Sequence, residues 1–125
     1  MSLTQISDAE AIIMRLLWQK HPLSADEICQ QLCQQHQWQA ATVKTLLNRL
    51  LNKQAIRAEK QSRYFLYSPV LKQEKWLQQE SRSFLERMFD GRVAPLVAHF
   101  SQQKKLSKQD LAELKQLIKD LDDAE

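Results

Sequence analysis

The sequence is poor in residues that break regular structure and in apolar runs long enough to enter a membrane. Its 125 residues include one glycine and three prolines, which excludes collagen-like and low-complexity proteins. No apolar run approaches the ~18 residues that a membrane helix needs. The chain also begins without a basic-then-apolar leader. We therefore expect a cytoplasmic protein with no membrane insertion.

Sequence patterns of catalysis are missing as well. The chain has no glycine-rich phosphate loop, no His-Glu metal motif and no nucleophile elbow, and its three histidines are scattered. We expect a protein that is not an enzyme and that holds no cofactor and no metal. Two cysteines, Cys29 and Cys33, are too few for a disulfide framework. Their spacing of four on a helix sets the two side chains nearly parallel, which suits a disulfide poorly.

Acidic residues are absent from residues 40–52, and this stretch carries the functional prediction. Its apolar residues recur at steps of three and four, which predicts an amphipathic helix. These residues are Val43, Leu46, Leu47, Leu50 and Leu51. The opposite side carries only hydroxyls, an amide and two cations: Thr42, Lys44, Thr45, Asn48 and Arg49. A solvated face usually mixes Glu with Lys, whereas these donors suit base edges and phosphates. The helix is therefore predicted to enter a DNA groove.

The segments around this helix predict a mainly α fold with a small β-hairpin, the winged helix-turn-helix. Capping boxes at residues 7–10 and 24–27 start two helices, which end near residues 20 and 36. Residues 56–60 and 63–68 read as two strands around a turn at residues 61–62. Residues 40–68 carry a net charge of +5. Lys60 and Arg63 at the hairpin tip are predicted to reach phosphates, with the Tyr64 hydroxyl beside them.

The tail from residue 71 is predicted to be helical and to join two copies of the chain. Gly91 is placed to end one helix in a left-handed conformation, and residues 107–110 cap a last helix. The apolar faces of the tail helices have no sheet or large core to cover them, which favours a homodimer. The residues predicted for dimerisation are Trp76, Phe84, Leu85, Met88, Leu96, Val97, Phe100, Leu114, Leu117, Ile118 and Leu121. The predicted domains are residues 1–70 for DNA binding and 71–125 for dimerisation.

Several of these segments together resemble one family of bacterial regulators. They are residues 6–10 with Trp18, Trp38, residues 42–46, Arg49 and Leu50, then Tyr64, Tyr67 and Pro69, and in the tail Phe84, Gly91, residues 96–100, Leu106 and Ser107. The chain resembles the penicillinase-repressor family of winged-helix regulators, the BlaI/MecI/CopY group. The resemblance implies a dimeric repressor whose third helix reads a palindromic operator on double-stranded DNA. Thr42, Lys44, Thr45 and Arg49 fall where the family contacts DNA.

Three departures from the family pattern carry expectations of their own. The copper-responsive branch has a C-terminal cysteine cluster that this tail lacks, so copper sensing of that kind is not expected. The antibiotic-responsive branch is inactivated by cleavage at an Asn-Phe bond, where this chain has His99-Phe100. That position makes a membrane sensor protease a candidate partner. Gln54 stands where the family has glycine in a turn, and a positive φ there costs about 1–2 kcal/mol.

Two other functions stay open on the residues alone. Cys29, Cys33 and His36 lie at i, i+4 and i+7, so they share one helix face and offer a soft-metal or redox-sensing site. Because free cysteine is commonly buried, a structural role is the simpler reading. A winged helix also serves some proteins as a protein-interaction module. A metal- or redox-responsive repressor and such a module are therefore the alternatives.

Overall fold

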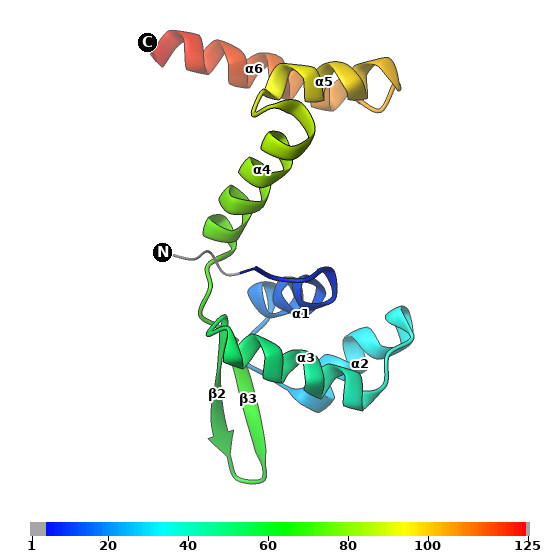
Figure 1. Cartoon of the computed structure of the whole chain (residues 1–125), viewed down its shortest axis with the longest axis vertical. Coiled ribbons are helices and arrows are strands. Elements are labelled where there is room, and N and C mark those ends of the chain that lie inside the picture. The colour runs from blue at the N-terminus through cyan, green and yellow to red at the C-terminus, as the bar shows by residue number, and fades with distance from the viewer. Residues whose placement is uncertain (1–4, 125) are drawn as a thin grey trace. The chain divides into compact units, whose positions relative to one another are not determined.

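The computed structural model describes residues 5–124, which a boundary between Gln79 and Glu80 divides into two compact units. The first unit holds α1 (Asp8–Gln19), β1 (Leu23–Ser24), α2 (Ala25–His36), α3 (Ala40–Asn52), β2 (Ile56–Gln61), β3 (Tyr64–Pro69) and the start of α4 (Gln73–Phe89) (Figure 1). The second unit holds the rest of α4, α5 (Val93–Gln102) and α6 (Lys108–Ala124). Three helices followed by a hairpin confirm the winged-helix prediction.

Both predicted capping boxes are present at the starts of α1 and α2. The Ser7 hydroxyl accepts from the Glu10 amide at 3.1 Å, and the Glu10 carboxylate accepts from the Ser7 amide at 2.8 Å. Ser24 and Glu27 repeat this exchange at 3.1 and 2.9 Å. These bonds satisfy backbone amides that the start of a helix otherwise leaves without a partner. Because each box spans only four residues, both helix starts could be predicted from the local sequence.

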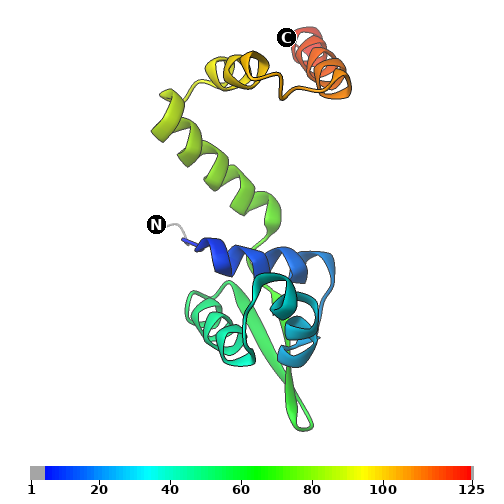
Figure 2. The same cartoon turned by 90° about the vertical axis from the view of Figure 1, so that its right-hand side faces the viewer.

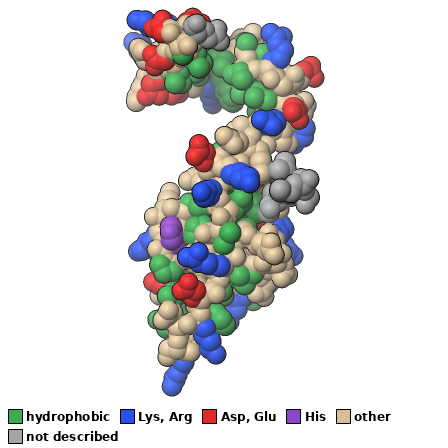
Figure 3. Space-filling view, turned by 90° about the vertical axis from the view of Figure 1, so that its left-hand side faces the viewer, with side chains coloured by type: hydrophobic (Ala, Val, Ile, Leu, Met, Phe, Trp, Pro, Cys, Tyr) green, Lys and Arg blue, Asp and Glu red, His purple; other side chains and the backbone are tan. Residues whose placement is uncertain are grey.

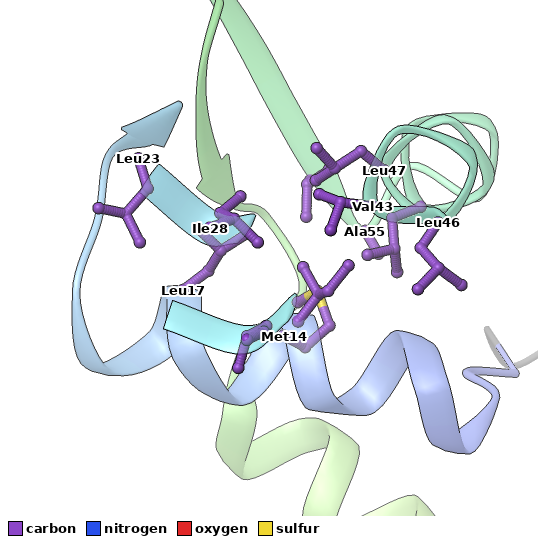
Figure 4. Close-up of a cluster of buried hydrophobic side chains, with 12 residues drawn as sticks. Met14, Leu17, Leu23, Ile28, Val43, Leu46, Leu47 and Ala55 are labelled. Carbon is purple, nitrogen blue, oxygen red and sulfur yellow. The ribbon is translucent and has the colours of Figure 1, made fainter. Parts of the chain in front are cut away.

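The core of the first unit lies between the three helices and the base of the hairpin, as Figure 4 shows. It is formed by Ile13, Met14 and Leu17 of α1, Ile28 and Leu32 of α2, Val43, Leu46, Leu47 and Leu50 of α3, and Leu23, Ala55 and Ile56 from the strands and their flanks. Burial of one such large side chain stabilises the fold by roughly 1.5–3 kcal/mol. Four residues of α3 are therefore anchored inward, which turns its polar side outward.

The sheet has three antiparallel strands in the order β1-β3-β2, one more than the sequence predicted. β1 pairs Leu23 with Tyr67 and Ser24 with Leu66. Two residues are too short to show the period-two alternation by which a strand is recognised. Ser24 belongs to β1 and also caps α2, so the hairpin is joined directly to the start of that helix.

An ion pair between an exposed lysine and a buried glutamate joins the beginning of α1 to the end of α3. The Lys53 ammonium donates to Glu10 Oε1 at 2.5 Å, and the Glu10 side chain is 1% exposed. Burial raises the pKa of Glu10, but the hydrogen bonds from Lys53 and Ser7 outweigh it and hold that pKa below its usual range. Lys53 caps the C-terminus of α3, so this contact fixes the helix against α1.

Helix α2 corrects the expectation for the two cysteines. Cys29 and Cys33 form a disulfide, and their Cα atoms lie 4.8 Å apart. Four residues of regular α-helix rise about 6 Å, so the turn between them is shortened. That local shortening brings together two side chains that ideal helix geometry holds apart. Among the described residues no group of three or more His, Cys, Asp or Glu side chains is placed to hold a metal.

Two positions singled out in the sequence, Gln54 and Gly91, have left-handed backbone conformations. Gln54 has a φ of 62° in the turn after α3, and Gly91 has a φ of 79° after α4. The left-handed stretch begins one residue before Gly91, at Asp90 with a φ of 52°, and the Gly91 amide donates to the Leu85 carbonyl at 2.8 Å. Gln54 is exposed, so its side chain does not compensate for the strained backbone through burial.

Trp76 belongs to the first unit, which changes its predicted role. Its ring lies 5.4 Å from that of Trp18, and the Arg15 guanidinium lies 5.6 Å from its centroid. The Trp18 indole donates to the Leu71 carbonyl at 2.8 Å, which ties the chain entering α4 to α1. Because Trp76 is only 6% exposed within one chain, it is not free to meet a second copy.

The second unit is built from helices whose apolar residues are largely uncovered. The exposed members of the predicted dimerisation set are Phe84, Met88, Phe100, Leu117, Ile118 and Leu121. Leu85, Leu96, Val97 and Leu114 are half-buried. His99 and Phe100 lie inside α5, and both are exposed. Of the helices described, none combines the length and the apolar character needed to cross a bilayer.

Candidate nucleic-acid interface

Helix α3 presents its predicted polar side to solvent. Lys44, Thr45, Asn48 and Arg49 are exposed, and Thr42 is half-buried. The Thr45 hydroxyl donates to the Ala41 carbonyl at 3.0 Å, which leaves its methyl group and its acceptor lone pairs available. An outward surface of donors without a carboxylate is the composition that duplex DNA selects, because phosphates and many base-edge atoms are acceptors.

The start of α3 differs from the starts of α1 and α2. Gln39 occupies the N-cap position, and its side chain makes no capping hydrogen bond. No acidic residue lies in the first turn, whereas α1 and α2 each have two. The positive end of this helix dipole is therefore left without a protein carboxylate at close range. A phosphate bound at this helix start would not be repelled by an acidic residue of the first turn.

The hairpin carries its basic residues to its tip, with a turn displaced by one residue from the prediction. Gln61 pairs with Tyr64, so the turn is formed by Ser62 and Arg63 rather than by residues 61–62. Ser62 has a φ of 55°, as two-residue hairpin turns require at their first position. Lys60 lies opposite Phe65, one residue pair away from the turn. Figure 3 shows lysine and arginine side chains gathered at this end of the hairpin.

A cleft of about 330 Å³ lies between the start of α2, the outward side of α3 and β3. Its lining consists of Ser24, Ala25, Asp26, Lys44, Asn48, Arg63, Tyr64, Phe65 and Tyr67. The structure thus brings Lys44, Asn48, Arg63 and Tyr64 together around one opening. The other predicted contact residues, Thr42, Thr45, Arg49 and Lys60, lie outside its lining. Figure 2 gives a second view of α2, α3 and the hairpin that border it.

Two ionisable side chains of the cleft, those of Asp26 and Tyr67, lie outside the predicted contact set. Asp26 brings a carboxylate into a lining that also holds Lys44 and Arg63, so it opposes an approaching phosphate. The capping box already placed Asp26 in the first turn of α2, but nothing local predicted that this turn faces the hairpin. Tyr67 is half-buried, and its burial raises the pKa of the phenol, so the ring keeps a neutral hydroxyl at neutral pH.

Three packed helices, an acid-free outward helix face and an adjoining basic hairpin define a winged-helix DNA-binding protein. The comparisons with known proteins give the particular family. The family model for the penicillinase repressor matches residues 6–120, and the chain belongs to this family. The chain is accordingly a DNA-binding transcriptional repressor.

Individual relatives agree with that assignment along most of the chain. The penicillinase repressor of Bacillus licheniformis is 31% identical over 116 residues, covering 93% of this chain and 91% of the relative. The methicillin resistance regulatory protein MecI of Staphylococcus aureus is 28% identical over 114 residues, covering 91% and 93%. A solution structure of monomeric Bacillus licheniformis BlaI with the blaP half-operator has 32% identity and a TM-score of 0.51, and it covers 58% of this chain and 89% of that one.

Proposed function

We propose that the chain is a cytoplasmic homodimer that represses transcription by binding an inverted-repeat operator, one half-site to each α3. The carrying observation is the acid-free outward side of α3 beside a cleft that also gathers Arg63 and Tyr64. The solved complex of monomeric Bacillus licheniformis BlaI with the blaP half-operator supports the binding of one chain to one half-site. Two copies related by a two-fold axis would present their third helices to successive major grooves.

The proposed division of labour assigns base reading to α3 and backbone contact to the hairpin. Lys44 and Arg49 are candidates for guanine or phosphate, and Asn48 for adenine. Thr42 and Thr45 suit a thymine methyl or a phosphate. Lys60, Arg63 and Tyr64 would contact phosphates, which carry no sequence information. Binding should therefore weaken steeply with salt, because neutralised phosphates release counterions.

The test begins by selecting duplexes from a random-sequence pool with the full chain. An enriched inverted repeat is expected, and its affinity is then measured for Lys44→Ala and Arg49→Ala. Loss of a base contact should cost about 1–3 kcal/mol. Lys115→Ala, in the exposed part of α6, is the matched control and should bind as wild type. Unchanged affinity in both α3 variants would exclude α3 as the reader, and a pool with no salt-sensitive binding would favour a protein-interaction module.

Hairpin variants separate backbone contact from base reading. Lys60→Ala and Arg63→Ala should weaken binding to the selected operator and to scrambled duplexes by the same factor. Each should also lower the salt slope by about one if it removes one phosphate contact. A changed sequence preference in either variant would place the hairpin tip on base edges instead.

Dimerisation is assigned to the uncovered apolar residues of the second unit. Phe84, Met88, Leu117, Ile118 and Leu121 are each at least 40% exposed within one chain. Large apolar surface left exposed usually marks an interaction site. A second copy offers the same surface, so a two-fold contact would cover both.

Release of repression is assigned to cleavage of the His99-Phe100 bond by a membrane sensor protease. The two side chains are exposed, which supports recognition there, but the bond lies within α5. A protease acts on extended chain, so α5 must open before cleavage. Co-expression with the sensor should yield a fragment ending at His99, and mass spectrometry would identify its terminus. Survival of intact protein under derepressing conditions would reject proteolysis.

A further inference from the structure

The disulfide of α2 lies where the helix leads into the DNA-reading element. Cys29 and Cys33 are both half-buried at the edge of the core, within reach of small reagents. They are the two cysteines of the whole sequence, so neither has another cysteine of this chain to pair with. We propose that they form a reversible thiol–disulfide modification site whose oxidation lowers the affinity of the chain for DNA. The inference rests on the DNA-binding function proposed above.

A short path of direct contacts joins Cys33 to the start of α3. The Cys33 carbonyl accepts the Trp38 amide at 2.8 Å and also the amide of Gln37. Gln37 has a left-handed φ of 58°, so the chain reverses there under a fixed geometry. Trp38 packs against the core and directly precedes Gln39, the N-cap of α3. A displacement of the Cys33 backbone is therefore passed to the first turn of α3.

The Trp38 side chain also lies at the junction between α2 and α3, the turn formed by residues 36–39. Its ring stacks on His36 with 5.1 Å between centroids. His36 is the last residue of α2, so the stack bridges the turn between the two helices. Any change in the last turn of α2 alters this stack together with the Trp38 amide bond. The junction thus has two groups that reveal whether it has moved.

The redox chemistry balances with small thiol reagents alone. In the reduced chain, the thiolate of one cysteine attacks a low-molecular-weight disulfide, forms a mixed disulfide and releases one small thiol. The second cysteine thiolate attacks the protein sulfur of that mixed disulfide, forms the Cys29–Cys33 bond and releases the second small thiol. The chain loses two electrons and two protons, which the small disulfide gains. A small dithiol reverses both steps.

The direction of the effect follows from the shortened turn. Cellular thiols keep such pairs reduced in the compartment that holds DNA, so the dithiol is the resting state of the repressor. Oxidation draws the Cα atoms of Cys29 and Cys33 to 4.8 Å from the roughly 6 Å of a regular helix. The Cys33 carbonyl moves with its Cα, and the start of α3 is drawn away from its resting position. We expect the DNA affinity to change by at least about fivefold, which is the lower end of the usual coupling between two sites of one protein.

The experiment compares two states of the full chain on the operator selected above. One sample is oxidised with a small disulfide and the other is reduced with a dithiol, and alkylation followed by mass spectrometry verifies each state. The oxidised chain should bind at least about fivefold more weakly than the reduced chain. The double variant Cys29→Ala with Cys33→Ala should bind equally under both conditions. Equal affinity of the two wild-type states overturns the inference, as does an effect that persists in the double variant.

A second readout separates this inference from the proposed function. If no state of any variant binds DNA, the DNA-binding proposal fails, and the junction is judged by the backbone amide resonance of Trp38. A shift of that resonance between oxidised and reduced wild type, absent in the double variant, retains the coupling from Cys33 to Trp38. An unchanged Trp38 resonance overturns it.

Discussion

Replacing Lys53 with methionine tests how α3 is held against α1. Lys53→Met keeps most of the side-chain volume and removes the ammonium that donates to Glu10. The Glu10 carboxylate, 1% exposed, then keeps only the Ser7 amide as a donor to its Oε1, and its Oε2 has no partner among the described residues. Breaking a fully buried ion pair costs about 3–5 kcal/mol. Because Lys53 itself is 36% exposed, solvent screening reduces that cost, and we expect about 2 kcal/mol at pH 7.

The pH dependence of this loss identifies its cause. The folded-state pKa of Glu10 lies below its ordinary value of 4.5, so the ionised group stabilises the fold above that value. That stabilisation disappears as the pH falls through the folded-state pKa. Without Lys53 the pKa of Glu10 rises, and a protonated carboxyl needs no counter-charge. The difference in stability between wild type and variant should therefore shrink towards zero at a pH below 4.5.

Urea unfolding at pH 7 and at acidic pH, followed by tryptophan fluorescence at one protein concentration, measures both quantities. Lys75→Met is the control, because Lys75 is exposed and forms no ion pair with any residue from 5 to 124. A loss in Lys53→Met no larger than the control would refute the reasoning. An equal loss at both pH values would assign the effect to packing rather than to charge.

Three further substitutions follow from the structure. Gln54→Gly should raise the free energy of unfolding, measured by urea titration, by about 1 kcal/mol, because glycine adopts a positive φ without strain. Gln30→Gly inside α2 should lower that free energy by a similar amount, and a change of the same sign in both variants would contradict strain at residue 54. Asp26→Asn should raise the affinity for the operator about two- to fivefold in fluorescence anisotropy, whereas Asp8→Asn at the start of α1 should leave that affinity unchanged. An unchanged affinity of Asp26→Asn would mean that the cleft does not face phosphate. Ile118→Glu should shift the chain towards monomer in sedimentation velocity, and an unaltered sedimentation coefficient would remove α6 from the proposed interface.

Features governed by neighbours in sequence were predictable, and features governed by distant contacts were not. The capping boxes and the inward stripe of α3 depend on spacings of three and four residues, so they were legible directly. The third strand was missed because Ser24 pairs with Leu66, more than forty residues away. Asp26 was missed for the same reason, because only the tertiary fold turns it towards Arg63.

Two further residues show how helical periodicity limits a prediction. Trp76 lies at helical spacing with the apolar residues of the tail, and periodicity alone does not say whether its partner is Trp18 or a second chain. Cys33 was placed from ideal helix geometry, whereas the real helix shortens by about 1 Å between it and Cys29. For both residues the predicted helix is correct, and the contact that the side chain makes depends on a partner that helical spacing does not specify.

The attachment of β3 on both of its sides has a consequence for the entropy of DNA binding. β2 pairs with it on one side, and the two residues of β1 pair with it on the other, at Tyr67 and Leu66. The base of the hairpin is therefore ordered during folding and not during DNA binding. If the hairpin contacts phosphate as proposed, its long tip side chains Lys60 and Arg63 lose freedom on binding, at about 0.5–1.5 kcal/mol each. A hairpin anchored in this way retains more of its electrostatic attraction as net affinity than a free basic loop of the same charge.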